Sequence, residues 1–426
     1  MQRYILIRGA RQVLTLRGPA PRRGRQLSEL GLIQDGAVLL VDDKIHSVGA
    51  SRRMENLKEA RLAEEIDATG KVVMPGFVDS HTHFVFPAAR LQDFERRIEG
   101  STYLETGRKG GGIHATVQAL RQTSPRGLAM RARRWLRLFA ACGTTTVEGK
   151  SGYGLSPASE RKILRVMKRL DGRPVEVVRT FLGAHVPPPE FADAPEEYVR
   201  LVVEEMLPRI RLRRLAEFCD VFCDTGAFTL AQSRRILVAA RELGLGLKIH
   251  ADQLTRLGAT RLAVELGAVS ADHLEQLEGE DIAALAASGT IATLLPGAVY
   301  YLGSDRYAPA RQLIERGAAV ALASDFNPGT SPTLNMQMIL SLASTQMKMT
   351  PAEAITAATI NGAAALGRAA KIGSLEPGKF ADLAIFDVGD YREIAYYFGM
   401  NLCRLTMRRG KVIWRAGVEQ AEENED

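Results

Sequence analysis

The chain has 426 residues, of which 46% are hydrophobic and 25% are charged, so it is long enough for one large α/β domain and a smaller one. No run approaches 18 apolar residues and the first residues hold no long apolar segment, so we expect neither a transmembrane helix nor a signal peptide. The formal net charge is +7 without a nucleic-acid-binding motif, which predicts no nucleic-acid partner and a mild preference for anionic substrates.

The first residues, up to about 70, predict short strands and turns. Segments 37–41 and 45–48 are β-rich and flank Asp42, Asp43 and Lys44, which predicts a hairpin. The other end, from about Gly373, has the same character, and the acidic residues 419–426 are expected to be frayed. We therefore expect a small β-sandwich-like domain formed by both termini, residues 1–72 and 373–426.

Between the two ends, β-rich segments alternate with helix-periodic ones. The β-rich segments are 72–78, 144–148, 175–182, 218–222, 247–250, 268–272, 290–295 and 320–324. The helix-periodic segments between them include 160–170, 194–207, 230–243, 259–266 and 281–287. Eight such alternations predict an α/β fold, a parallel (β/α)8 TIM-like barrel over residues 73–372. A doubly wound sheet is the alternative, but no glycine-rich dinucleotide turn follows the first strand.

The four cysteines suit a reducing cytoplasm, where we expect the protein to reside. Cys219 and Cys223 lie four residues apart in a predicted strand and could form half of a zinc site. No second Cys/His pair of suitable spacing lies near them, so we interpret both as buried apolar side chains.

Histidines gather at the ends of the predicted strands. Five of the seven lie at or just beyond the C-terminal end of a β-rich segment, namely His81, His83, His185, His250 and His273. Asp325 follows the last segment. Active sites of (β/α)8 barrels are built at that end, so we expect these side chains to share one site.

A metal site is the hypothesis that best fits four of these residues: His81, His83, His250 and Asp325. Side chains alternate along a strand, so His81 and His83 point the same way. Neutral imidazoles with one carboxylate suit Zn or Fe. An ion held there lowers the pKa of a bound water toward ~7, which favours hydrolytic chemistry.

The same segments carry a resemblance to a known family. They are VMPGFVDSHTH at 73–83, Arg90, 107–113, GKSGYGL at 149–155, FLGAH at 181–185, EEMLP at 204–208, DVFCDTGAF at 220–228, KIHADQ at 248–253, GAVSADHLE at 267–275, LLPG at 294–297, SDFNPGTSPTLNM at 324–336, AATIN at 357–361 and GSLEPGKFADL at 373–383. In this order they resemble the metal-dependent amidohydrolase superfamily and, more narrowly, its imidazolonepropionase family. The resemblance extends over nearly the whole chain.

The resemblance implies an enzyme of histidine degradation. Water would add to the cyclic amide of 4-imidazolone-5-propanoate and give N-formimidoyl-L-glutamate, with one divalent or trivalent metal ion, Zn or Fe, per subunit. It also implies a carboxylated heterocycle as substrate and a possible homodimer. By similarity, the substrate-binding residues would be Arg90, Tyr153, His185, Gln253, Asn327, Gly329 and Thr330.

The chemistry of these side chains agrees with such a substrate. Arg90 offers a two-pronged donor for a propanoate group, and the turn after Asn327 could present backbone N–H groups to a carboxylate. His273 could orient the attacking water or stabilise the oxyanion, and Asp325 could move the proton. Gln253 stands where some members carry Glu; an amide cannot shuttle a proton, so we expect Gln253 to orient the ring.

Pro87, just before Arg90, fixes its own φ and could change how that arginine is presented. Two other functions remain open at this stage. One is a related amidohydrolase or deaminase that acts on another small heterocycle. The other is a barrel that has lost its metal and serves as a scaffold; such a protein would be expected to lose ligands, whereas all four are present.

Overall fold

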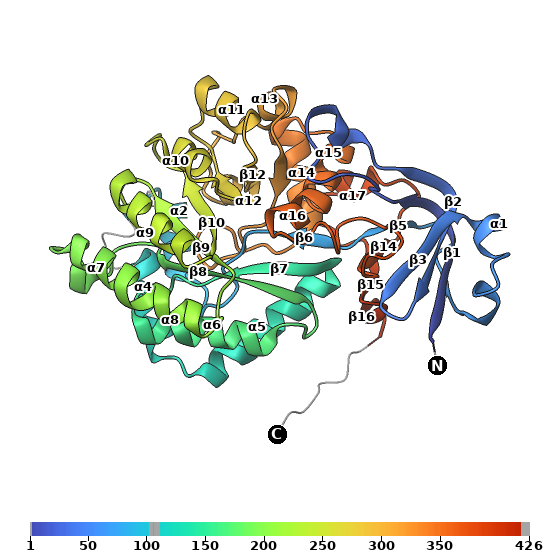
Figure 1. Ribbon diagram of the computed structural model, residues 1–426, viewed down its shortest axis with the longest axis horizontal. Coiled ribbons are helices and arrows are strands. Elements are labelled where there is room, and N and C mark those ends of the chain that lie inside the picture. Colours follow the sequence, from blue (N-terminus) through green and yellow to red (C-terminus); the bar gives the residue numbers. More distant parts are fainter. Residues whose placement is uncertain (1, 102–104, 106–110, 419–426) are drawn as a thin grey trace.

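The computed structural model describes residues 2–101, 105 and 111–418, and its central feature is a parallel barrel (Figure 1). Its strands, in spatial order, are β6 (Phe77–Asp79), β7 (Thr144–Lys150), β8 (Glu176–Ala184), β9 (Phe218–Cys223), β10 (Gly246–Ala251), β11 (Ser270–His273), β12 (Ile291–Leu294) and β13 (Val320–Leu322). A parallel bridge between Thr82 and Phe326 joins the chain after β6 to the chain after β13. The predicted (β/α)8 barrel is thus confirmed.

Helices surround the barrel. The longer ones are α2 (Leu91–Ile98), α4 (Gly112–Gln122), α5 (Pro125–Ala141), α6 (Pro157–Leu170), α7 (Pro195–Leu201), α8 (Leu207–Leu212), α9 (Leu230–Glu242), α10 (Ala259–Leu266), α11 (Gly279–Ala286), α12 (Pro296–Tyr301), α13 (Ala310–Glu315), α14 (Met336–Met347), α15 (Pro351–Ala357) and α16 (Ile360–Ala365). The short helices α1 (Ser51–Met54) and α17 (Glu393–Tyr396) lie outside this ring. The start of α6 is set by its own sequence: the Ser156 side chain accepts a hydrogen bond from the Ser159 N–H, and Pro157 occupies the first helical position.

One predicted helix is interrupted. Residues 194–207 were expected to form a single helix, but α7 passes through a π-helical turn (Val202–Met206) into α8. Pro208 has no N–H to donate to the preceding turn, so the regular hydrogen-bond ladder is broken there.

The two ends of the chain form a second sheet. Its strands are β1 (Tyr4–Leu14), β2 (Leu32–Val41), β3 (Lys44–Ala50), β4 (Glu64–Asp67), β5 (Val72–Pro75), β14 (Leu383–Phe386), β15 (Cys403–Arg408) and β16 (Lys411–Arg415), in the order β16-β15-β14-β5-β1-β2-β3 with β4 beside β1. Val41 pairs with Lys44, which confirms the hairpin around Asp42 and Asp43. The separate terminal sheet agrees with the expected architecture, while domain limits at 72 and 372 stay a prediction.

The segment 72–78 was expected to be one barrel strand, and this is corrected. It is divided at Gly76: β5 pairs with β14 in the terminal sheet, whereas β6 pairs with β7 in the barrel. Pro75 has no backbone N–H, so it cannot donate a hydrogen bond to a neighbouring strand. Gly76 packs so closely that a Cβ there would lie 2.3 Å from Thr145 Cγ2. The chain therefore changes sheets at a residue that only glycine can occupy without displacing its neighbour.

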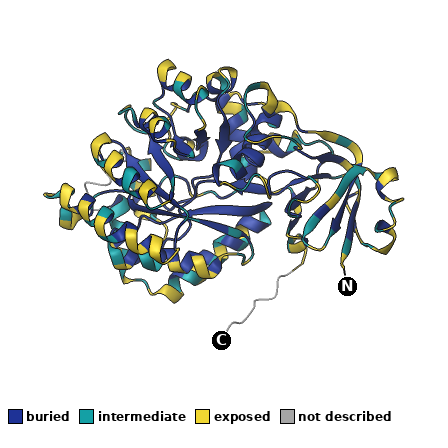
Figure 2. Ribbon diagram, viewed as in Figure 1, coloured by how far each residue is buried: buried dark blue, intermediate teal, exposed yellow. Residues whose placement is uncertain are grey.

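Burial follows this architecture. Figure 2 shows buried barrel strands inside helices whose outer faces are exposed. Cys219 and Cys223 are buried in β9, as expected. Within residues 2–101, 105 and 111–418, no helix is both long and apolar enough to cross a membrane. Residues 107–110 of the family segment and the acidic residues 419–426 lie outside the described residues.

Candidate active site

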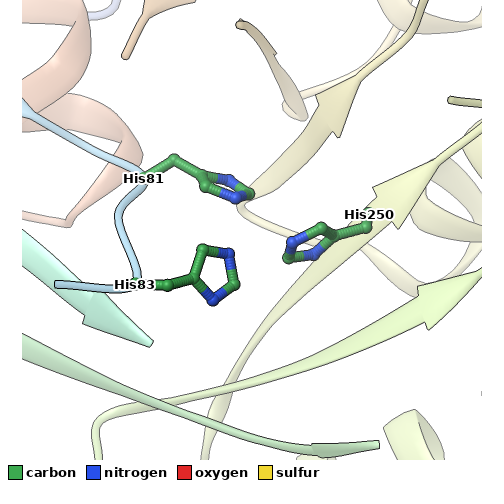
Figure 3. A group of neighbouring side chains, drawn as sticks. All are labelled: His81, His83 and His250. Carbon is green, nitrogen blue, oxygen red and sulfur yellow. The ribbon is translucent and has the colours of Figure 1, made fainter. Parts of the chain in front are cut away.

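The four proposed metal ligands converge at the C-terminal end of the barrel. The rings of His81 and His250 have centroids 4.5 Å apart, and those of His81 and His83 are 5.3 Å apart. Asp325 Oδ1 lies 3.6 Å from His81 Nε2 and 3.7 Å from His83 Nε2. Figure 3 shows the three imidazoles facing a common space. His81, His83 and His250 each offer a nitrogen within 4.8 Å of the others, as a metal requires.

Backbone hydrogen bonds hold the segment that contains His81 and His83 in an extended conformation. The Thr82 carbonyl accepts from the Lys150 N–H at 2.9 Å, and the His83 N–H donates to the Phe326 carbonyl at 2.9 Å. The Asp325 N–H donates to the His81 carbonyl at 3.0 Å. This segment thus lies between β7 and the chain after β13, and both imidazoles project into the barrel mouth as the strand alternation predicts.

Two residues of the site have backbone conformations that non-glycine residues rarely adopt. Asp325 has φ 53° and His273 has φ 82°. Left-handed backbone at such positions stores strain and is concentrated at functional sites. Both residues follow or end a barrel strand, so the strain aims their side chains inward.

The histidine nitrogens fit a metal ion. Burial lowers the pKa of His81, His83 and His250 well below the usual value, so all three rings are neutral at pH 7. His81 Nε2, His83 Nδ1 and both His250 nitrogens are buried without a hydrogen-bond partner among the described residues. Buried polar atoms are seldom left unpaired, so the arrangement is that of a ligand site. Neutral nitrogens next to a carboxylate are the donors that Zn or Fe accepts.

His273 lies beside this group and differs from it electrostatically. Its ring centroid is 5.2 Å from that of His250, and its Nδ1 lies 3.5 Å from Glu275 Oε1. Burial alone would lower the pKa of His273, but Glu275, Asp325 and Asp272 together raise it. Burial raises the pKa of Asp325 to about 7. Sequence reasoning missed Glu275, although it follows His273 by two residues in the segment DHLE.

A cavity that is open to solvent extends from the histidines. Its walls include the residues expected to bind substrate, with the exception of Gly329: Arg90, Tyr153, His185, Gln253, Asn327 and Thr330. The apolar side chains Ile113, Phe222, Leu254 and Leu302 complete the lining and were not anticipated. The structure therefore gathers charged, polar and apolar groups suited to a small amphipathic molecule.

Arg90 precedes helix α2 at the edge of this cavity. Its Nε donates to Thr116 Oγ1 at 2.7 Å, which fixes the plane of the guanidinium. Its Nη2 is buried with no hydrogen-bond partner in the described part of the chain. A Cβ at Gly329 would lie 2.3 Å from Arg90 Nη1, so Gly329 makes room for Arg90. A fixed guanidinium with an unused donor is suited to an anionic group.

The loop after β7 brings Tyr153 next to His185, which follows β8, with ring centroids 5.5 Å apart. Buried Glu160 accepts hydrogen bonds from the N–H groups of Gly152, Gly154 and Leu155, which shapes the loop. His185 Nδ1 is 3.0 Å from the Gly152 carbonyl, and its ring stacks on that of His83 at 5.3 Å. The loop conformation therefore rests on one carboxylate that the sequence did not single out.

The turn after Asn327 differs from expectation. Asn327 Oδ1 accepts from the N–H groups of Gly329 at 2.8 Å and Thr330 at 2.7 Å. Asn327 Nδ2 donates to the Asp325 carbonyl at 2.6 Å and to Thr330 Oγ1 at 2.8 Å. The two backbone N–H groups are thus already used, because a short polar side chain competes for nearby backbone donors. In this structure the turn holds Asp325 and Thr330 rather than presenting free N–H groups.

A second group of buried charges lies inside the barrel and was also missed. We name it the ion layer, and it consists of Glu148, Lys150, Asp220, Lys248 and Asp272. Lys248 is two residues before His250 on β10, so it faces the same way at one level deeper. Lys150 Nζ lies 2.7 Å from Asp220 Oδ2, and Lys248 Nζ lies 3.1 Å from Glu148 Oε2. Charged residues within predicted buried strands were the available signal, because such charges are almost always paired.

Comparison with known proteins places these features in a family. Residues 72–413 match the model of the Amidohydrolase family. The imidazolonepropionase of Solibacter usitatus is 50% identical over 408 residues, covering 95% of this chain and 97% of that protein. The imidazolonepropionase of Geobacillus kaustophilus is 48% identical over 420 residues, 97% of this chain and 99% of that protein. A solved adenosine deaminase from Xanthomonas campestris with bound zinc shares the fold, with a TM-score of 0.70 and 20% identity over 96% of this chain and 92% of the other.

Proposed function

The chain belongs to the amidohydrolase family and, within it, to the imidazolonepropionases, and from that membership we propose that it hydrolyses 4-imidazolone-5-propanoate to N-formimidoyl-L-glutamate in histidine degradation. The observation that carries this proposal is a single cavity lined both by proposed metal ligands and by an arginine. His83, His250 and Asp325 line it together with Arg90. A hydrolytic centre and an anion-binding arginine within reach of one small molecule support a carboxylated heterocycle as the substrate.

Arg90 binds the propanoate group in this proposal, and Gln253 orients the ring. The Arg90 Nη2 donor has no partner among the described residues, so it is available for a carboxylate oxygen. Gln253 lines the cavity and can donate and accept a hydrogen bond at once. Phe222 packs against His185 and His250, so an apolar wall keeps bulk water from the bound ring.

The proton chemistry falls to Asp325 and His273. Asp325 accepts a proton from the attacking water as the new C–O bond forms at the cyclic amide carbonyl. His273, whose pKa is raised, donates a hydrogen bond to the oxyanion that develops there. Asp325 then returns its proton to the ring nitrogen as the C–N bond breaks, so the balance of the reaction is one water consumed.

A single metal ion, Zn or Fe, is assigned to His81, His83, His250 and Asp325. When bound, such an ion supplies Lewis-acid activation of water and of the carbonyl. The four cysteines are free thiols, in keeping with a reducing cytoplasm. We further propose that the enzyme acts without nucleic-acid or membrane partners, and a homodimer is part of the same proposal.

The direct test follows loss of the ultraviolet absorbance of 4-imidazolone-5-propanoate with purified protein and added Zn²⁺ or Fe²⁺. We expect turnover that chelation abolishes and metal restores. Absence of turnover, with ammonia released from a purine or pyrimidine base instead, would replace the proposal by a deaminase. Protein that binds no metal and turns over neither substrate would favour a scaffold role.

A further inference from the structure

Lys150 is fully buried at the end of β7, yet the proposed reaction uses no part of it. Its side chain is 0% exposed, and burial opposes its charge, although Asp220, Glu148 and Asp272 more than offset this and raise its pKa. A buried lysine requires such partners. What distinguishes Lys150 is which carboxylates it contacts.

Three carboxylates surround Lys150, at 2.7 Å (Asp220), 3.2 Å (Glu148) and 3.3 Å (Asp272) from its Nζ, and two of them also contact a proposed metal ligand. Asp272 Oδ2 lies 3.3 Å from Lys150 Nζ and 2.6 Å from His81 Nδ1. Asp220 Oδ2 lies 2.7 Å from Lys150 Nζ and 3.0 Å from His250 Nδ1. One ammonium group therefore connects His250 on β10 with His81, which follows β6.

The contact from Lys150 to each imidazole passes through a single carboxylate oxygen. In each carboxylate the same atom, Oδ2, meets both the lysine and the imidazole, whereas Oδ1 of Asp220 and of Asp272 has no hydrogen-bond partner in the described residues. The lysine position thus determines where each Oδ2 lies. The hydrogen bond between His81 Nδ1 and Asp272 Oδ2 leaves the Nε2 lone pair of His81 for a ligand and fixes the orientation of its ring. Asp220 Oδ2 lies close to His250 Nδ1 without hydrogen-bond geometry, so this second contact acts through charge and position.

We propose that Lys150 is a positioning residue, which through Asp220 and Asp272 holds His81 and His250 together in the orientation that binds the metal. The inference rests on the metal site of the proposed function and deepens it. Lys150 touches neither the cavity nor the reacting atoms, so its effect is on metal affinity and ligand geometry rather than on substrate binding.

The ion layer offers a matched control. Lys248 is equally buried and pairs with Glu148 Oε2 at 3.1 Å and with the Ser80 carbonyl at 3.4 Å. Within the described chain, its Nζ forms no hydrogen bond or ion pair with Asp220 or Asp272. Lys248→Met therefore removes a buried, paired lysine from the same layer, as Lys150→Met does, without removing the link to the two imidazoles.

The test measures Zn²⁺ dissociation constants of full-length wild type, Lys150→Met and Lys248→Met by chelator competition, and the visible spectra of their Co²⁺ forms. We expect Lys150→Met to lose about 10- to 100-fold in Zn²⁺ affinity, the usual effect of removing an outer partner of a ligand, and to have an altered Co²⁺ spectrum. Its KM at saturating Zn²⁺ should be unchanged. Lys248→Met should keep the wild-type affinity and spectrum, even if both variants unfold at lower temperature.

Two results would overturn the inference: wild-type affinity and spectrum in Lys150→Met, or equal losses in both variants. If Lys150→Met does not fold, Lys150→Gln, which keeps one short donor, takes its place with the same required difference from Lys248→Met. Combining Lys150→Met with Asp272→Asn should give less than the sum of the single losses, because both act on His81. A wild type that binds no Zn²⁺ or Co²⁺ refutes the proposed metal site itself, a result distinct from equal binding by wild type and variant.

Discussion

Two buried groups of ionisable side chains occupy successive levels of the same barrel, and they differ in how their polar atoms are paired. In the ion layer, both lysine Nζ atoms lie within 3.3 Å of carboxylate oxygens. In the upper group, which we name the histidine cluster (His81, His83, His250, His273 and Asp325), every histidine has a ring nitrogen without a partner among the described residues. Pairing stabilises the two lysines of the lower level, although Oδ1 of Asp220 and of Asp272 has no partner there among the described residues, while the unpaired imidazole nitrogens of the upper level are available to a ligand.

The largest expected effect comes from Asp325→Asn in the histidine cluster. The amide cannot accept the proton, so kcat/KM should fall by about 10³-fold or more. Because burial raises the pKa of Asp325 to about 7, its ionised form is disfavoured in the metal-free fold and the neutral amide should not lower the melting temperature. Turnover and thermal unfolding of the metal-free variant check both statements. A variant with activity within tenfold of wild type would remove Asp325 from the reaction.

For Glu148→Gln in the ion layer we expect the opposite result, a loss of stability that exceeds the loss of activity. The substitution leaves Lys248 buried without its carboxylate, and breaking such a pair costs about 3–5 kcal/mol of unfolding free energy. Urea denaturation of the metal-free protein measures this. Unchanged stability together with lost activity would contradict the view that the ion layer stabilises the fold while the histidine cluster carries the reaction.

A smaller effect is expected at the far end of the cavity. Arg90→Met removes the donors proposed for the propanoate group, and losing charged hydrogen bonds worth about 1.5–3 kcal/mol should raise KM by about 10- to 100-fold. The matched control is a 4-imidazolone that lacks the propanoate arm, for which both proteins should perform alike. If Arg90→Met impairs both substrates equally, Arg90 supports the fold of the mouth rather than the carboxylate.

The smallest effect is expected for Gln253→Ala, where KM should rise by about tenfold and kcat should fall less, as expected for loss of roughly one neutral hydrogen bond. Steady-state kinetics separates the two constants. A collapse of kcat at constant KM would place proton transfer at Gln253 and contradict its orienting role.

Much of this architecture could be predicted from strand periodicity. The eight β-rich segments and their polar ends indicated the barrel and brought His81, His250 and Asp325 to one rim, because parallel strands end at one edge. The division at Gly76 could not be read from an uninterrupted apolar run, since it depends on the approach of Thr145 from a distant segment. The internal bonds of Asn327 depend on a turn conformation that competes with ligand binding.

The ion layer was missed for a different reason. Its charges lie in segments such as TTTVEGK and FCDVFC, where Glu148, Lys150 and Asp220 look like interruptions of an apolar strand. Only the closed barrel shows that they face one another. Pairing across strands is a property of the tertiary structure, and one sequence gives no means of assigning it.

The change of sheets at Pro75 and Gly76 has a consequence for how the chain is assembled during synthesis. β5 pairs with β14 through Val73 and Ile385, so the terminal sheet is complete only after almost all of the chain has been made. Only Gly76 separates β5 from β6, and β6 pairs with β7, which is synthesised much sooner than β14. Contacts between distant segments form late. The strand that leads directly to His81 and His83 is thus anchored on its N-terminal side by one of the last strands to emerge. A chain truncated before Leu383 would leave the β14-facing edge of β5 unpaired, a few residues before the first proposed metal ligands.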